Sequence, residues 1–195
     1  MKNFFKKFAL SLSLMMFGIL LLNTNSASAE VLPNNGLVKL DYTIDEIRQM
    51  SLGEYYSKIF PETFDEFTTE QQEELFNTPY PNIKSKVSLG LGVGYSSLWK
   101  SSTNVLGYGV STTMDLGSDT AKKLYHSSVL TDSNGTTWMI RNEGKSDTNY
   151  FYMGGYKDVV SGKYRLETVH TVNWPSGYFP STSSDVSASD WVYSY

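Results

Sequence analysis

Apolar and small residues alternate with a period of two along much of the chain after residue 83, and this pattern constrains the fold more than any other. In SLGLGVGY, residues 88–95, every second side chain is apolar and glycines stand between them. NVLGYGVS, residues 104–111, repeats the pattern. A period of two places alternate side chains on opposite faces of a β-strand. We therefore expect two strands, each with one almost bare face.

Four further segments are rich in apolar, β-branched and aromatic residues and are expected to form strands: residues 124–143, 149–160, 162–174 and 185–195. The first contains Asn134-Gly135, which favours a β-hairpin with a two-residue type I′ turn. Six to eight short strands separated by turns predict a mainly β fold. We expect an antiparallel β-sandwich or a small barrel.

The glycines in residues 88–97 do not fit a nucleotide site. A phosphate-binding loop needs a tight turn that leads into a helix, with Lys-Ser/Thr after the glycines or the spacing G-x-G-x-x-G. This stretch has neither the spacing nor a following helix. Glycine inside a strand is instead typical of a bulge or of a close backbone approach. We expect no nucleotide and no cofactor here, but a groove or another layer packed unusually near.

The first 29 residues have the pattern of a secretory signal peptide. Three lysines and no acid precede an almost wholly apolar stretch, residues 8–22, and Ala27-Ser28-Ala29 supplies the small residues of a cleavage site. The apolar stretch is shorter than the roughly 20 residues of a membrane-spanning helix. We expect cleavage after Ala29 and a mature chain that is extracellular or bound to the cell wall.

Cysteine is absent and lysine outnumbers arginine 13 to 3. An exported domain without disulfides depends on its core for stability. Together the two features are typical of a Gram-positive source. Without the leader, the chain has 13 basic and 20 acidic residues, a net charge of −7. A chain this acidic is not suited to nucleic acid, because binding to phosphates requires a basic surface.

The acidic charge is concentrated in one segment. Residues 30–77 carry 11 acids and three bases, whereas residues 78–195 carry nine acids and 10 bases. Such an asymmetry indicates two kinds of structure, and the prolines and asparagines of NTPYPN, residues 77–82, punctuate the chain between them. We therefore divide the chain into a signal peptide (1–29), an acidic helical arm (30–82) and a β-domain (83–195).

The arm is expected to contain short helices. Thr43 and Ser51 each stand three residues before a glutamate, which is the spacing of a capping box. Pro61 ends the second helix, and a third begins at Thr68 or Thr69 and ends near Asn77. Nine apolar side chains can line one face: Ile44, Ile47, Tyr55, Ile59, Phe60, Phe64, Phe67, Leu75 and Phe76. The arm is expected to be a helical layer on the β-domain; a detachable pro-segment or a partner-binding arm is the alternative.

Ser161, Gly162, Tyr164, Arg165 and His170 follow a tryptophan-bearing hairpin in a chain with a leader of this kind. This combination resembles small uncharacterised secreted proteins of bacilli and related Gram-positive bacteria. The resemblance covers roughly residues 105–185. It implies a secreted β-domain, and it carries no activity and no catalytic residue to this chain.

Candidate catalytic and metal-binding groups are few. His126 and His170 are the two histidines, and the chain has neither a G-x-S-x-G elbow nor an H-E-x-x-H pair. His170 shares the apolar face of its expected strand, so we predict a core residue rather than a general base. The DSNG segment lacks the acidic ligands that complete a calcium loop. We assign no catalytic residue and no metal.

Aromatic residues crowd the last third of the chain. Those in NWPSGYFPSTSS, residues 173–184, lie in a predicted loop with two prolines, and exposed aromatic rings beside small polar residues can stack on sugars or dock a protein. We predict that Trp174, Tyr178 and Phe179 form a binding surface. Trp191, Tyr193 and Tyr195 form a separate aromatic stripe at the C-terminus.

These features predict a secreted, non-catalytic binding or interaction module whose partner is a cell-wall glycan or a surface or secreted protein. The first alternative is a membrane-active or pore-forming secreted protein, because glycine-rich alternating strands and terminal aromatic residues also occur in strands that enter membranes. A membrane partner is nevertheless not expected, since residues 83–195 barely supply enough strands. The second alternative is a secreted hydrolase.

Overall fold

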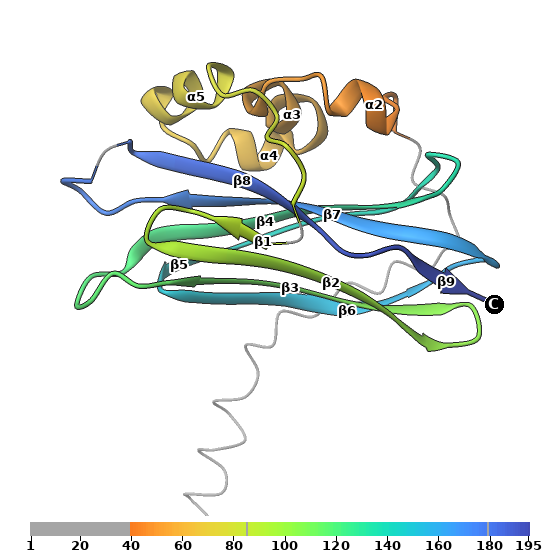
Figure 1. Ribbon diagram of the computed structural model, residues 1–195. Helices are drawn as coiled ribbons and strands as arrows, with labels where there is room; N and C mark the ends of the chain where they lie inside the picture. Colours follow the sequence, from red (N-terminus) through yellow and green to blue (C-terminus); the bar gives the residue numbers. More distant parts are fainter. Residues whose placement is uncertain (1–39, 85, 179) are drawn as a thin grey trace, which may run out of the picture. The chain divides into compact units, whose positions relative to one another are not determined.

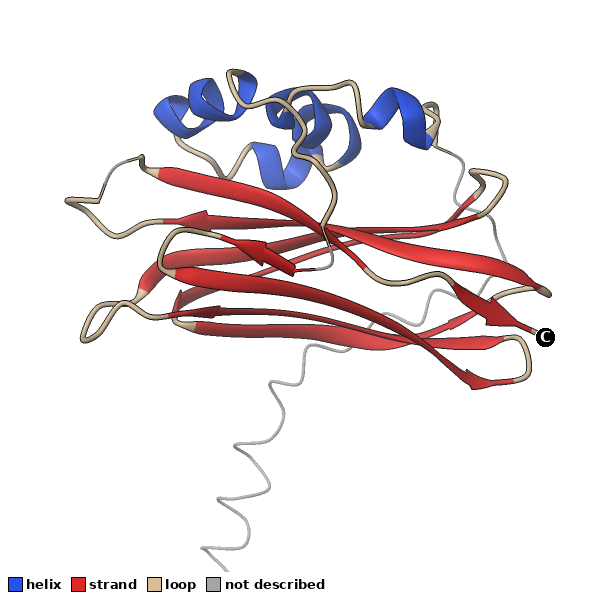
Figure 2. Ribbon diagram, in the orientation of Figure 1, coloured by secondary structure: helices blue, strands red, loops and turns tan. Residues whose placement is uncertain are grey.

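The computed structural model describes residues 40–84, 86–178 and 180–195. The predicted signal peptide and the first ten residues of the predicted arm lie outside the described residues. Within the described part, three layers lie on one another: short helices, a five-stranded sheet and a four-stranded sheet (Figures 1 and 2).

All strand pairs within the two sheets are antiparallel. The four-stranded sheet has the order β1-β2-β3-β6, and the five-stranded sheet has the order β5-β4-β7-β8, with β9 also paired to β7. The first sheet comprises β1 (Lys86–Ser88), β2 (Gly92–Ser102), β3 (Val105–Met114) and β6 (Tyr150–Asp158). The second comprises β4 (Ala121–Asp132), β5 (Thr137–Thr148), β7 (Gly162–Asn173), β8 (Thr182–Ala188) and β9 (Val192–Ser194). The predicted mainly β fold is confirmed, and the sandwich is the form it takes.

The expectation of six to eight short strands was too low in number and in length. Nine strands are described, and β4, β5 and β7 each have 12 residues. Alternate residues of the long strands form the core between the two sheets, which includes Leu98, Leu106, Val110, Leu124, Met153 and Leu166.

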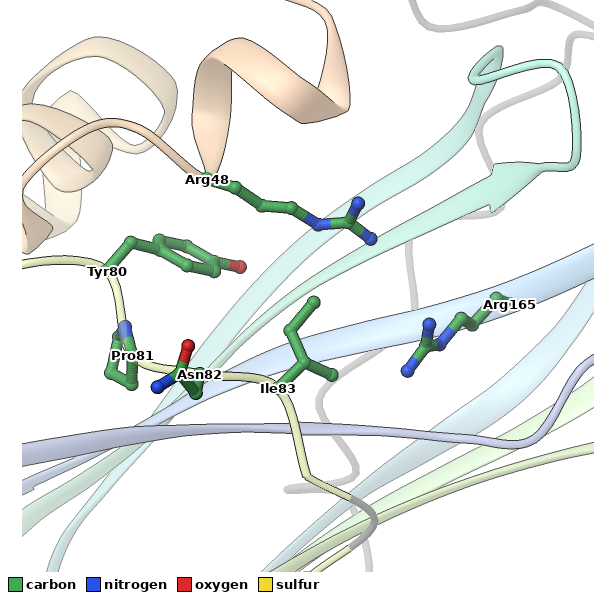
Figure 3. A pocket seen from close by; sticks show the side chains of 6 residues that line it. All are labelled: Arg48, Tyr80, Pro81, Asn82, Ile83 and Arg165. Atoms are coloured by element: carbon green, nitrogen blue, oxygen red, sulfur yellow. The ribbon is translucent and has the colours of Figure 1, made fainter.

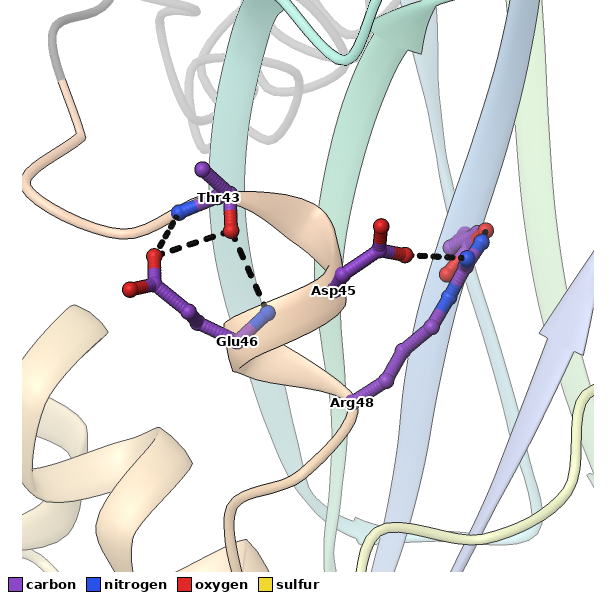
Figure 4. Close-up of polar contacts among 5 residues, drawn as sticks. Thr43, Asp45, Glu46 and Arg48 are labelled. Carbon is purple, nitrogen blue, oxygen red and sulfur yellow. Dashed lines mark hydrogen bonds and ion pairs between the residues drawn. The ribbon is translucent and has the colours of Figure 1, made fainter.

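The helices of the described part are α2 (Ile44–Ile47), α3 (Leu52–Ile59), α4 (Pro61–Phe64) and α5 (Thr69–Phe76). Three of these four helices begin where the sequence predicts, whereas α4 was not expected and begins at Pro61 without a side-chain cap. Thr43 and Glu46 cap α2 reciprocally (Figure 4), Ser51 and Glu54 cap α3, and α5 begins after Thr68. These caps are local hydrogen bonds between residues three apart, which is why sequence spacing predicts them.

The helices cover the outer face of the five-stranded sheet with a second apolar core. This core combines helix residues, among them Leu52, Tyr55 and Leu75, with Tyr125 of β4 and Val169 of β7. The hydroxyl of Tyr55 donates to the carbonyl of Ser127 (3.1 Å). Buried aromatic side chains supply most of the contact area and place their hydroxyls on backbone or side-chain acceptors.

Two local predictions were wrong. The hairpin at Asn134-Gly135 exists, but only Gly135 has a positive φ (83°), whereas a type I′ turn needs two such residues. The amide of Gly135 bonds to the carbonyl of Asp132 (3.1 Å), which makes a longer loop that ends on glycine. The expected strand over residues 88–95 is also broken, because the chain turns between β1 and β2 at Gly90, whose φ is 72°.

The glycine side of β2 faces the core. Gly94 is buried, and a Cβ atom there would lie 2.6 Å from Val87 Cγ2 and 2.7 Å from His170 Cγ. Glycine therefore lets the His170 ring of the opposite sheet approach the β2 backbone, as the predicted close approach requires. Consequently Val93 and Tyr95, which alternate with the glycines of β2, point away from the core.

Candidate ligand-binding surface

An aromatic face covers the outside of the four-stranded sheet, on the side away from the helices (Figure 1). Six of the 12 exposed large hydrophobic side chains in the described part belong to it. We define the aromatic face by these six residues: Val93, Tyr95 and Trp99 of β2, and Tyr150, Tyr152 and Tyr156 of β6. A contiguous exposed apolar surface of this kind marks an interaction site.

Strand register places the six side chains in two parallel rows. β3 lies between β2 and β6, so that Tyr95, Ser111 and Tyr152 stand in line across the sheet. Trp99, Gly107 and Tyr156 form another line. The middle strand presents only small groups outward, which are Gly107, Gly109, Ser111 and Thr113. The face thus consists of two aromatic rows on either side of a strand whose outward groups are small.

Two of the aromatic rings lie directly over glycines. A Cβ atom on Gly107 would overlap the indole of Trp99, and one on Gly154 would overlap the ring of Tyr152. Each ring therefore covers bare backbone, while the two side chains remain 41% and 52% exposed. Rings held in this way lose little conformational entropy when a ligand stacks on them.

Formal charge is sparse on this face. Lys86 of β1 pairs in register with Tyr95, and Asp158 at the end of β6 pairs with Val105, so one cation and one anion flank opposite ends. Between them the groups are aromatic rings and hydroxyls. Such a surface can stack on flat apolar faces and exchange hydrogen bonds, and it offers no cluster of charge to an ionic ligand.

The predicted binding loop has a different environment. Trp174 and Tyr178 stack on each other with ring centroids 5.8 Å apart, are half-buried, and pack against the core between the sheets. The Trp174 indole donates to Ser183 (2.8 Å), and the Tyr178 hydroxyl donates to Asp119 (3.1 Å). Phe179 lies outside the described residues. The two described rings are separate from the aromatic face and stay predicted binding residues.

A hydrogen-bonded chain of histidines and hydroxyls crosses the core between the sheets. Thr112 of β3 bonds to Nε2 of His126 (2.8 Å) and to Nδ1 of His170 (2.9 Å). Nε2 of His170 then bonds to Ser187 (2.6 Å), which bonds to Ser96 (2.6 Å). All five side chains are buried. The prediction that His170 is a core residue is confirmed; the part played by His126 was missed.

Both imidazoles of this chain are neutral. Burial lowers the pKa of His170 to about 3, and burial followed by the neighbouring His170 lowers the pKa of His126 well below its ordinary value. Ser187 and His170 have the distance of a nucleophile and its base. Neither side chain has solvent access, however, so this pair cannot meet an external substrate in the described conformation.

The C-terminal aromatic stripe lies on the other sheet and is surrounded by cations. Lys163 lies over the rings of Trp191 and Tyr193, and Lys100 lies 3.3 Å from the ring centroid of Tyr195. The ring faces on this side are thus partly occupied by cation–π contacts.

Within residues 40–84, 86–178 and 180–195, no cluster of three or more acidic or histidine side chains is arranged to hold a metal ion. In the same part of the chain, no helix is long and apolar enough to span a membrane. The sequence matches no protein-family model and no curated protein.

Proposed function

We propose that this protein is a secreted, non-catalytic binding module that holds a cell-surface glycan on its aromatic face. The observation that carries the proposal is the pair of exposed aromatic rows, in which Trp99 and Tyr152 lie over glycines of the sheet. Pyranose rings have apolar faces that stack on aromatic rings and hydroxyls that bond to side chains such as those of Tyr95, Ser111 and Thr113.

The charge of the protein favours a neutral ligand over nucleic acid or an anionic membrane. The mature chain has a net charge of −7, and the aromatic face has one cation and one anion at its ends. Nucleic acid and anionic membranes attract basic surfaces, which this face lacks. An uncharged polysaccharide does not need a basic surface and is not repelled by the acidic protein.

The membrane-active alternative is favoured by one observation, the abundance of tyrosine and tryptophan on an exposed surface, because these residues also settle at membrane interfaces. The hydrolase alternative would need an accessible nucleophile and base, and the Ser187–His170 pair is buried. We therefore place the glycan-binding proposal first and test the membrane alternative alongside it.

The test is co-sedimentation of the mature chain with purified Gram-positive cell walls and with an insoluble neutral polysaccharide. Tyr95→Ala and Tyr156→Ala remove side chains that are 52% and 70% exposed, so the fold should tolerate both changes. Each is expected to weaken binding about tenfold, or about 1.4 kcal/mol. Tyr193→Ala is the matched control, because it removes an exposed tyrosine (60%) from the other sheet.

Equal binding by all four proteins, or equal losses in Tyr193→Ala, would contradict the proposal. Leakage of a trapped dye from neutral vesicles that depends on Tyr95 and Tyr156, without glycan binding, would instead establish the membrane-active alternative.

A further inference from the structure

An open pocket of about 260 Å³ lies where the helical layer, the segment before β1 and the five-stranded sheet meet (Figure 3). Its lining residues are Arg48, Tyr80, Pro81, Asn82, Ile83 and Arg165. Arg48 follows α2, and Arg165 is in β7. In Figure 3 the two guanidinium groups and the Tyr80 hydroxyl extend toward the space around Ile83. The pocket is thus bounded by hydrogen-bond donors that come from three separate segments.

Buried polar atoms without a hydrogen-bond partner are concentrated around this pocket. Five buried side-chain polar atoms in the described part have no hydrogen-bond partner, and three of them belong to Arg48 (Nε), Arg165 (Nε) and Glu167 (Oε2). Folded proteins leave few such atoms unpaired, because each costs roughly 1–3 kcal/mol. Two of the three are guanidinium donors of residues that line the same pocket.

The charges around the pocket define what it can accept. Arg48 forms ion pairs with Asp45 (3.4 Å; Figure 4) and with Glu167, so one guanidinium is already balanced. No described carboxylate lies within ion-pairing distance of Arg165. The two arginines and the two carboxylates, Asp45 and Glu167, have no net charge together. A dianion would add more negative charge than the unpaired Arg165 can balance, so the pocket favours a ligand with one negative charge over a phosphate dianion.

The remaining lining groups complete a donor set for an anion. Burial, and then the negative charge of Glu167, raise the pKa of Tyr80, so its hydroxyl stays protonated and can donate. Asn82 adds an amide. A planar carboxylate matches the fork geometry of a guanidinium group, and in Arg165 the two terminal nitrogens, which are not among the buried unpaired atoms, can form that fork.

We propose that this pocket binds a carboxylate group between Arg48 and Arg165. The carboxylate belongs either to a small organic acid or to the C-terminus of a peptide, because the pocket is open on one side and too small for a larger ligand to be enclosed. This site is distinct from the aromatic face, which lies on the other sheet. Its occupation would link α2 to β7 through one bound group.

Arginine side-chain NMR provides a direct test. The chain contains three arginines, Arg48, Arg141 and Arg165, and therefore three Nε–H signals. Arg141 is an internal control, since its Nε donates to Glu143 (2.7 Å) at another site. Titration with acetate, and with a short peptide that has a free C-terminus, is expected to shift the signals of Arg48 and Arg165 and to leave that of Arg141 in place.

The probes separate the two sources of the carboxylate. Tighter binding of the peptide than of acetate identifies a peptide end, and equal binding identifies a small acid. The same peptide with an amidated C-terminus should bind at least tenfold more weakly than the free acid. Inorganic phosphate at equal ionic strength should also be weaker.

Two variants test the residues. Arg165→Lys keeps the charge but loses the fork, and it is expected to weaken carboxylate binding at least tenfold. Lys163→Gln removes a cation from the same strand, outside the pocket, and should bind as the unaltered protein does. Unshifted Arg48 and Arg165 signals with every carboxylate, equal binding of the amidated peptide, or an equal loss in Lys163→Gln would overturn the proposal.

Discussion

At the scale of single residues, the two buried histidines are the groups most sensitive to their surroundings. His126 stacks on Phe151 with ring centroids 4.5 Å apart, and its ring centroid lies 5.1 Å from that of His170. Asp185, the residue paired with His170 across β7 and β8, is engaged by Lys84 (3.3 Å) and by the amide of Val186. Protonation of both histidines would therefore place two positive charges close together in the core, and the nearby carboxylate of Asp185 is already engaged by other groups.

Acid is expected to destabilise the protein through these histidines. Their folded pKa values lie below the unfolded value of about 6.5, so the unfolded state binds the protons first. The stability associated with the neutral rings is complete above about pH 6.5 and falls as the pH decreases. For His170, whose folded pKa is about 3, the loss is roughly 1.4 kcal/mol per pH unit below 6.5, and His126 adds a loss in the same direction. Urea unfolding at pH 7 and pH 5 measures this loss.

Glutamine is the matched replacement, because it stays neutral and can still exchange hydrogen bonds. His170→Gln should retain only part of the loss between pH 7 and pH 5, and the double variant with His126→Gln should retain least. An unchanged pH dependence in the double variant would show that other groups cause the acid sensitivity.

At the scale of elements, the contact of β2 with β7 depends on a missing side chain. Gly94 brings the β2 backbone against the His170 ring, and its neighbours along the strand, Val93 and Tyr95, are exposed. Around Gly94 the strand therefore has small side chains on its buried face and large apolar side chains on its exposed face. An ordinary half-buried strand has its large apolar side chains on the buried face.

Gly94→Ala is expected to lower the free energy of unfolding by about 1–3 kcal/mol, because the added methyl group overpacks the site. Thermal or urea unfolding provides the measurement. Val93→Thr, an exposed change of similar shape on the same strand, should alter stability by less than about 0.5 kcal/mol. A Gly94→Ala variant as stable as the Val93→Thr variant would mean that the sheets can move apart without cost.

At the scale of the whole molecule, the layers separate two candidate sites. The aromatic face lies on the four-stranded sheet, and the arginine pocket lies between the helical layer and the five-stranded sheet. The core between the sheets and the core under the helices hold these surfaces without any disulfide.

Export belongs to the same scale, since it determines which chain folds. We expect intact-mass analysis of the culture supernatant to find a chain that begins at Glu30, because Ala27-Ser28-Ala29 fits a signal-peptidase site. Replacing Ala29 with a large residue, as in Ala29→Phe, should block the cleavage. A supernatant protein that retains residues 1–29 would contradict the predicted processing.

Local features could be predicted from the sequence by itself. The caps at Thr43 and Ser51 and the end of α3 before Pro61 depend on residues within one helical turn. The period of two identified β-structure and the mainly β fold, because alternation along a strand is a property of the backbone. The burial of His170 also followed from its place in that alternation.

The candidate sites depended on the tertiary structure. Alternation in the sequence separates the two faces of a strand but does not show which face is buried. In the structure, the His170 ring packs against Gly94, so the opposite face of β2, with Tyr95 and Trp99, is exposed. The meeting of Arg48 with Arg165 joins residues 117 positions apart, for which the sequence holds no local signal. The physical reason is the same in each case: a side chain's exposure and partners are set by whichever distant element packs against it.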